Sequence, residues 1–277
     1  MIRGAVATLL IAAAAVPLAA QPTGEPSKAA AETASPLSAA LAAPSRTPAN
    51  VARDKYRHPA ETLTFFGVKP GDTVVEIWPG GGWYTEILAP YLKSGGGKLL
   101  LGTLDGQPGG IAKLQAAQPA LYNHQTFNFP AFDAGANRIP DGTADVVLTF
   151  RNVHNWRMGY QREGKSDYSS EAFKQIYAML RKGGVLGIVD HRLPEDASAE
   201  RERTSGYIKV STVRRLAEEA GFRLVGSSEI NANPKDTADW PDGVWTLPPV
   251  LRLKEQDREK YVAIGESDRM TLKFVKP

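Results

Sequence analysis

The sequence contains no cysteine in its 277 residues. This absence excludes a disulfide framework, a thiol nucleophile, a thiolate metal site and a lipid-anchored N-terminal cysteine. An excess of one charge is also lacking, because 33 lysines and arginines stand against 30 aspartates and glutamates, for a formal net charge of +3. A chain with this balance gives no reason to expect nucleic acid or an anionic membrane as a partner.

Long hydrophobic runs are missing as well, although the chain begins with a short one. Met1, Ile2 and Arg3 precede an apolar stretch that ends at Ala20 and is too short to span a bilayer comfortably. A charged start before a short apolar core is typical of a secretory signal peptide. We therefore expect residues 1–20 to be a signal peptide and the protein to be exported, and periplasmic if its source has a Gram-negative envelope. An uncleaved membrane anchor is the alternative.

Residues 21–50 consist largely of alanine, proline, serine and threonine, with almost no large apolar side chain. A segment of this composition cannot bury enough surface to offset the entropy lost on ordering. We predict a disordered Ala/Pro-rich linker over residues 21–50 and one large domain over residues 51–277.

The most informative segment is residues 74–85, where an apolar run ends in an acid and then turns through glycines. Glycines let the backbone turn tightly and approach a ligand, and a helix that starts just beyond offers unpaired N–H groups. The dinucleotide fingerprint is absent, because Thr85 stands where a third glycine or alanine is needed. A P-loop is absent too, since Gly97 and Lys98 lack the following serine or threonine. The loop indicates a small polar ligand at the mouth of an α/β sheet.

Apolar runs suited to strands alternate with segments of helical spacing along the rest of the chain. Strands are expected over residues 74–77, 98–101, 125–129, 144–150, 185–189 and 270–275, with a further one from Phe222 and helices after Thr85, Ser170 and Ser211. This order predicts a doubly wound, mostly parallel seven-stranded sheet with an antiparallel last strand. Ligands in such sheets bind outside the carboxyl ends of the parallel strands. The residues that follow strands one, two, four and five should therefore face the ligand.

An apolar strand, an acid and glycines at alternate positions resemble the first motif of the class I S-adenosylmethionine-dependent methyltransferases. Glu76, Gly80 and Gly82 match that motif, and Trp78 stands where its first glycine is expected. Residues 141–150 and 180–190 resemble the fourth and fifth strands of the same Rossmann-like fold. The Trp-Pro-Gly-Gly-Gly-Trp-Tyr loop and a later His-Asn-Trp are most similar to a group of exported, predicted methyltransferases.

The resemblance implies S-adenosylmethionine as the cofactor and an acid that organises both the glycine loop and the cofactor's amino-acid end. Asp105 is the candidate for the ribose, because Thr103 occupies the spot where an acid is expected, and Asp133 is a candidate near the adenine. The cofactor-binding residues implied in this way are Glu76, Trp78, Gly80, Gly81, Gly82, Tyr84, Asp105, Asp133 and Asn152.

Residues 151–156 directly follow the fourth expected strand, where methyl acceptors meet the transferred group in the related family. His154 is a candidate general base because an imidazole titrates near neutral pH, and Trp156 is a candidate to stack on a ligand. Asn155 joins them as a catalytic candidate. The alternative is that His154 is a buried, hydrogen-bonded residue that shapes the loop.

His191 ends the fifth expected strand, so it should converge with His154 at one mouth of the sheet. Two functions are open to such a pair: acid/base work on an acceptor, or a metal held by both histidines and Asp190. Because the sequence has no compact ligand spacing, we predict no metal. Tyr56 and His58 are secondary candidates in a segment that often covers the cofactor in related folds.

Residues 231–269 form a long connection that should overhang the site and act as a lid or acceptor pocket. The pattern as a whole favours a methyltransferase acting on a small or envelope-associated acceptor. A non-catalytic ligand-binding protein on the same scaffold is the alternative, because Trp78 replaces a glycine and the ribose acid is displaced. We expect no nucleic-acid partner and no stable membrane insertion after signal cleavage, and the sequence leaves the oligomeric state open.

Overall fold

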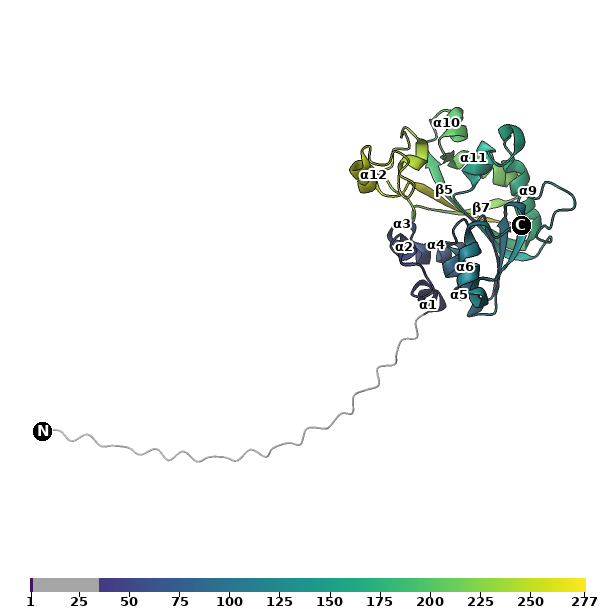
Figure 1. Cartoon of the computed structure of the whole chain (residues 1–277), viewed down its shortest axis with the longest axis horizontal. Helices are drawn as coiled ribbons and strands as arrows, with labels where there is room; N and C mark the ends of the chain where they lie inside the picture. The colour runs from purple at the N-terminus through teal and green to yellow at the C-terminus, as the bar shows by residue number, and fades with distance from the viewer. Residues whose placement is uncertain (2–34) are drawn as a thin grey trace. The chain divides into compact units, whose positions relative to one another are not determined.

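The computed structural model describes Met1 and residues 35–277 (Figure 1). The predicted signal peptide, apart from Met1, and the first part of the predicted linker lie outside the described residues. The chain divides into two units, residues 1–33 and residues 34–277, and the second contains every described residue except Met1. None of its helices is both long and apolar enough to cross a bilayer.

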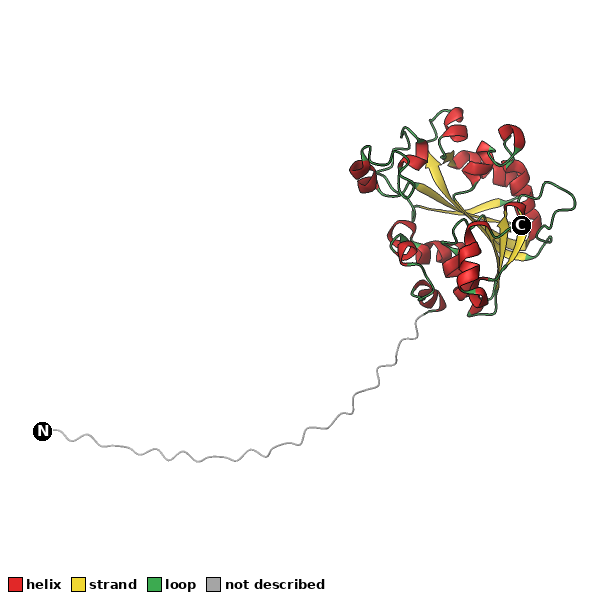
Figure 2. Cartoon of the chain, in the orientation of Figure 1, coloured by secondary structure: helices red, strands yellow, loops and turns green. Residues whose placement is uncertain are grey.

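The second unit is built on one mostly parallel sheet (Figure 2). Its strands run in the order β3-β2-β1-β4-β5-β8-β7, and the two-residue β6 pairs with β5 outside this path. Strand β8 is antiparallel to both of its neighbours, so the predicted doubly wound sheet with a reversed last strand is confirmed, with one short strand added. The strands are β1 (Thr73–Ile77), β2 (Lys98–Thr103), β3 (Gln125–Asn128), β4 (Ala144–Phe150), β5 (Leu180–Leu193), β6 (Ile208–Lys209), β7 (Arg223–Ser228) and β8 (Arg269–Val275).

Helices lie on both sides of this sheet (Figure 2). Short 3-10 helices at residues 104–106, 109–111, 163–165 and 243–246 accompany them. The α-helices of the described chain are α1 (Pro36–Leu41), α2 (Pro48–Val51), α3 (Asp54–Arg57), α4 (Pro59–Phe66), α5 (Thr85–Lys93), α6 (Ala112–Ala117), α7 (Pro119–Tyr122), α8 (Val153–Met158), α9 (Ser169–Met179), α10 (Ala199–Thr204), α11 (Val210–Glu219) and α12 (Arg258–Ile264).

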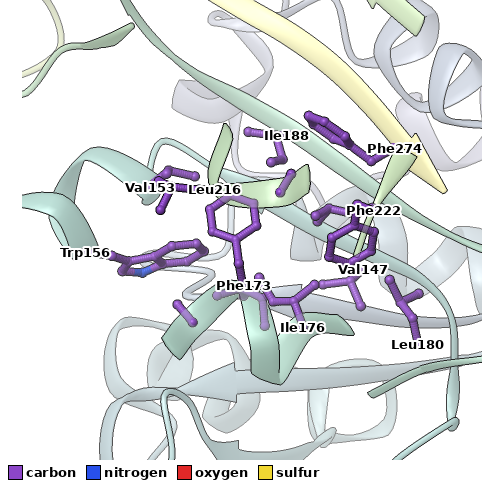
Figure 3. Packing of buried hydrophobic residues seen from close by; sticks show 14 of the residues in the cluster. Val147, Val153, Trp156, Phe173, Ile176, Leu180, Ile188, Leu216, Phe222 and Phe274 are labelled. Carbon is purple, nitrogen blue, oxygen red and sulfur yellow. The ribbon is translucent and has the colours of Figure 1, made fainter. Parts of the chain in front are cut away.

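Each face of the sheet has its own hydrophobic core. On one face, strand residues such as Val147 and Ile188 pack against Phe173 and Ile176 of α9 and Leu216 of α11 (Figure 3). The three- and four-residue spacing of apolar side chains in α9 and α11 places them on the side that meets the sheet. Helices α1, α4 and α5 supply the core of the other face. Burial on both faces explains why the central strands read as continuous apolar runs.

The segment before residue 51 is part of the folded body, so the prediction of a disordered linker is wrong for residues 35–50. Helices α1 and α2 form there. Arg46 makes a two-pronged ion pair with Asp54, at 2.7 and 2.8 Å. The Thr47 amide donates to the Glu86 carboxylate of α5 at 3.0 Å. Polar contacts to α3 and α5, together with the apolar side chains that α1 adds to the core, hold the segment in place.

Candidate functional site

A cavity of about 250 Å³, named the main cavity, opens at the carboxyl ends of β1, β4 and β5. The glycine loop after β1 and the segment after β4 form two of its walls. Trp245, Pro248 and Val250, from the long connection before β8, form another, so this connection overhangs the site as predicted. The polar and loop residues of its lining include Glu76, Trp78, Gly80, Gly81, Tyr84, Arg151, Asn152, His154, Asn155, His191, Glu266 and Ser267.

Glu76 is an almost completely buried acid at the floor of the main cavity. It lies near the end of β1, in register with Leu101 of β2 and Leu148 of β4. The Thr85 hydroxyl donates to its Oε2 at 2.7 Å. Burial raises the pKa of Glu76 to about 7, because a carboxylate loses its hydration among apolar strands. One hydrogen bond does not offset that loss, so the carboxyl group is suited to a ligand that brings a positive charge or a donor.

Replacing Glu76 by glutamine is expected to remove part of the pH dependence of stability. The folded-state pKa is about 7 against an ordinary value of 4.5, so only the folded state holds the proton between these values. The free energy of unfolding should therefore fall as pH rises through that window, by roughly 3 kcal/mol for this group. Thermal unfolding of both proteins between about pH 4.5 and pH 8 measures the difference. Parallel curves for wild type and Glu76→Gln would contradict this account.

Trp78 occupies an unusual backbone position in the glycine loop. Its φ is +48°, in the left-handed region that favours glycine, and such conformations are typical of functional or strained sites. The indole Nε1 donates to the carbonyl of Phe129 at 2.7 Å, which ties the end of β1 to the residue after β3. The ring edge also packs on Trp156, with centroids 6.2 Å apart.

A second cavity of about 310 Å³ adjoins the loop near the end of β2. It shares Trp78, Pro79, Gly80 and Asn152 with the main cavity, and Thr103 and Gln107 complete its polar lining. Trp78 therefore borders both cavities.

Two histidines lie together in the wall of the main cavity. The rings of His154 and His191 have centroids 5.0 Å apart. The Nδ1 of His154 lies 2.6 Å from Oδ1 of Asp190, and because a carboxylate can only accept, Nδ1 is the donor of this pair; in a neutral imidazole with that tautomer, Nε2 is an acceptor. The Nδ1 of His191 lies 2.5 Å from the Ser267 hydroxyl. The predicted convergence of His154 and His191 is confirmed.

The same pair is the candidate for a metal site with Asp190. Donor atoms of these three residues lie within 4.8 Å of one another. The Asp190 carboxylate, however, already accepts from the His154 ring and from the backbone N–H of His191 and of His154, at 2.6, 2.7 and 3.3 Å. Burial, followed by the positive charges around it, lowers the pKa of His191 well below its usual range. Both oxygens of Asp190 are engaged within the protein, and His154 is held as one partner of a buried Asp190–His154 pair beside His191.

A cluster of arginines beside the histidines was not predicted. Arg53, Arg57 and Arg269 all contact the one carboxylate of Glu266, at 2.7, 3.1 and 3.1 Å. Arg151 lines the main cavity close by. These residues come from α3 and the position before it, from the segment after β4 and from the start of β8, which lie far apart in the sequence. Of these residues only Arg151 lies in a segment that the sequence singled out, residues 151–156 after β4.

Several predicted residues lie elsewhere. Asp105 and Asp133 are exposed and line neither cavity, so the proposed contacts to ribose and adenine are not supported. A side chain at Gly82 would meet Leu114 and Ile111, which shows that this glycine permits close packing rather than ligand approach. The prediction that Trp156 stacks on a ligand is wrong, because its indole is completely buried in the core.

The remaining candidates divide between the cavity and its surroundings. Asn155 lines the main cavity. Asn152 is held by hydrogen bonds from Nδ2 to the Ile77 carbonyl and the Thr149 hydroxyl, at 2.9 and 3.1 Å, which joins the ends of β1 and β4. Tyr84 stacks on Phe150 at 3.5 Å between centroids and forms part of the wall. Tyr56 and His58 do not line the main cavity.

Solved structures with the same architecture are known. A SAM-dependent methyltransferase from Aquifex aeolicus superposes with a TM-score of 0.52 at 16% identity, covering 82% of this chain and 93% of that one. A putative sarcosine dimethylglycine methyltransferase from Galdieria sulphuraria superposes with a TM-score of 0.53 at 14% identity, covering 82% and 86%. This chain has the class I methyltransferase fold. The 4+2 cyclase SpnF is also similar, with a TM-score of 0.50 at 15% identity and 80% of each chain covered. No protein-family model and no curated protein matches the sequence.

Proposed function

We propose that the protein is an S-adenosylmethionine-dependent methyltransferase that acts on a small or envelope-associated acceptor after export. The observation that carries this proposal is the main cavity itself, where a buried acid, two open glycines and the Asp190–His154 pair meet at the carboxyl ends of β1, β4 and β5. In a sheet of this kind ligands bind at that edge. The methyltransferases with the same fold support the proposal only as an analogy, because the fold alone does not specify function.

The residues fit the amino-acid half of the cofactor well. Oε1 of Glu76 makes no hydrogen bond within residues 35–277, and Glu76 lines the main cavity. Gly80 and Gly81 have open space where a Cβ would stand, so the backbone there can be approached closely. At the second cavity the hydroxyl of Thr103 and the amide of Gln107 take the place of the expected ribose acid. When bound, S-adenosylmethionine would supply an electrophilic methyl group.

The histidines provide the proton chemistry that an acceptor hydroxyl or amine would need. Asp190 holds the ring of His154 with Nδ1 protonated, which presents Nε2 as the base. His191 stays neutral at neutral pH, because burial and nearby cations lower its pKa. Base catalysis of this kind contributes typically 10²- to 10⁴-fold, and most of the remaining acceleration would come from positioning in the cavity.

Calorimetric titration of the full chain with S-adenosylhomocysteine tests the proposal directly. We expect binding in the micromolar range, about −8 kcal/mol, and a loss of roughly tenfold or more in Glu76→Ala, because a charge-assisted contact at a buried acid is removed. Glu255→Ala is the matched control, since the Glu255 side chain is 87% exposed. No detectable binding of S-adenosylhomocysteine by folded wild-type protein would contradict the methyltransferase proposal.

The rival function is a ligand-binding protein that has lost the cofactor. Trp78 favours it, because the indole borders both cavities and is anchored on Phe129. A cyclase with a similar fold shows that the scaffold also serves other chemistry. A Trp78→Gly variant separates the two functions, because glycine adopts a positive φ without strain. If S-adenosylhomocysteine binds only to Trp78→Gly, the indole blocks the cofactor site in the wild type, which supports the function of a ligand-binding protein without this cofactor.

A further inference from the structure

The arginine cluster around Glu266 carries more positive charge than its acids balance. Three guanidinium groups share one carboxylate, and Arg151 adds a fourth nearby. Asp190 is the next acid, but its oxygens are engaged by His154 and the backbone of His191. The balance is therefore four arginines against Glu266 and an Asp190 that already accepts other hydrogen bonds.

Several guanidinium nitrogens of the cluster also lack a hydrogen-bond acceptor. Nη2 of Arg53, Nη2 of Arg57 and Nε of Arg269 are buried without a hydrogen-bond partner in the described part of the chain. Burial and the neighbouring Arg151 lower the pKa of Arg57 to about 8, and burial lowers the pKa of Arg151 to about 10. Buried donors without acceptors and unbalanced buried charges lower the stability of the folded state. A bound anion would accept hydrogen bonds from these donors and offset part of the charge.

Arg151 is the member of the cluster that faces the main cavity. It directly follows β4 with φ at +64°, and its backbone N–H donates to the Val189 carbonyl at 2.7 Å. Its side chain makes no hydrogen bond or ion pair with residues 35–277, and it lines the cavity beside His154 and His191. By contrast, the buried Arg46 directs two of its nitrogens to Asp54. A guanidinium fork held open at a cavity is the group that proteins use to bind carboxylate and phosphate.

We propose that the cluster of Arg53, Arg57, Arg151 and Arg269 is an oxyanion subsite of the main cavity, with Arg151 as the contact to a carboxylate or phosphate group of the ligand. The proposal rests on the proposed function for the identity of that ligand, though not for its charge. The anionic group has two possible sources, the methyl acceptor and the amino-acid end of the cofactor. The closeness of Arg151 to His154 makes an acidic acceptor the source to test first.

The test titrates the full chain with inorganic phosphate and follows binding by calorimetry and thermal shift. We expect Arg151→Gln to bind phosphate roughly ten- to hundredfold more weakly than wild type, because a charge-assisted, two-pronged contact is lost. The phosphate affinity of Arg151→Lys should lie between those of wild type and Arg151→Gln, since lysine keeps the charge but lacks the two parallel N–H donors of the guanidinium group. Arg138→Gln is the matched control, because the Arg138 side chain is 59% exposed. Equal affinity in wild type and Arg151→Gln, or no phosphate binding by folded wild type up to about 50 mM, would overturn the proposal.

A second titration identifies the source of the anion and keeps this proposal apart from the proposed function. Phosphate is added to protein saturated with S-adenosylhomocysteine. Unchanged phosphate affinity assigns the subsite to the acceptor, whereas competition assigns it to the cofactor's carboxylate. In the second case a decarboxylated analogue of S-adenosylhomocysteine should no longer compete. If S-adenosylhomocysteine does not bind while phosphate does, the methyltransferase proposal fails and the oxyanion subsite stands.

Discussion

Glu266→Gln is expected to lower the free energy of unfolding by about 3–5 kcal/mol, because removal of one partner from a buried ion cluster leaves the others uncompensated. The Glu266 side chain is 4% exposed and pairs with Arg53, Arg57 and Arg269. Burial alone would raise the pKa of this carboxyl group, but attraction to the arginines outweighs burial and lowers it to about 2. A neutral amide can keep hydrogen bonds but cannot offset the repulsion among the guanidinium groups. Urea unfolding at neutral pH measures the change.

The controls for Glu266 follow from the same charges. Glu255→Gln should change stability by less than about 0.5 kcal/mol, because Glu255 is a surface residue. Since the folded-state pKa of Glu266 is depressed from 4.5 to about 2, its stabilising contribution is present above the ordinary value and is lost as pH falls through that window. Wild type should therefore lose more stability than Glu266→Gln on acidification. A loss below about 1 kcal/mol at neutral pH would show that the cluster is not coupled through this carboxylate.

Trp156→Ala should destabilise the protein by about 3–5 kcal/mol, the range for large aromatic side chains removed from a core. Trp156 is completely buried and meets the rings of Phe129 and Phe173 edge to face, at 5.6 and 6.0 Å between centroids. Figure 3 shows Trp156 beside Phe173. These contacts join α8 to α9 and to the end of β3. Denaturant unfolding with an unchanged slope would confirm a loss of packing rather than a change of folded state.

The matched variant for Trp156 is phenylalanine. The indole Nε1 has no hydrogen-bond partner among residues 35–277, so Trp156→Phe loses volume but no hydrogen bond and should cost less than alanine. A phenylalanine variant as unstable as the alanine variant would point to a ligand or water on Nε1 and would return Trp156 to the functional site. Loss of Trp156 should also loosen Trp78, whose ring packs on it.

The fold was predictable because its signals are local. The apolar run before Glu76 and the glycines after it lie within one strand and one turn, and alternation of strands and helices determines the doubly wound class. The meeting of His154 and His191 also followed from topology, since β4 and β5 are neighbours and their carboxyl ends share an edge. A position at the end of a central strand was thus enough to place both residues at the main cavity.

The charges of the site were harder to predict, because they depend on contacts between distant segments. Nothing around Glu266 in the sequence indicates three arginine partners, two of which precede it by more than two hundred residues. Asp105 lines neither cavity for a different reason: it lies beyond the strand end, with φ at +56°, and the path of a loop is not encoded in periodicity. The linker was misjudged because composition measures apolar burial and overlooks polar contacts such as that of Thr47 with Glu86.

The contact of Thr47 with Glu86 also bears on where this protein can be shortened. Glu86 is fully buried and receives donors from residue 47, which precedes β1, the first strand of the sheet. A chain begun at Val51 would keep every strand of the sheet and yet leave Glu86 of α5 without the two donors of Thr47. A shortened form should therefore begin at Ser35, because it then keeps Thr47 as the donor to the buried Glu86 carboxylate.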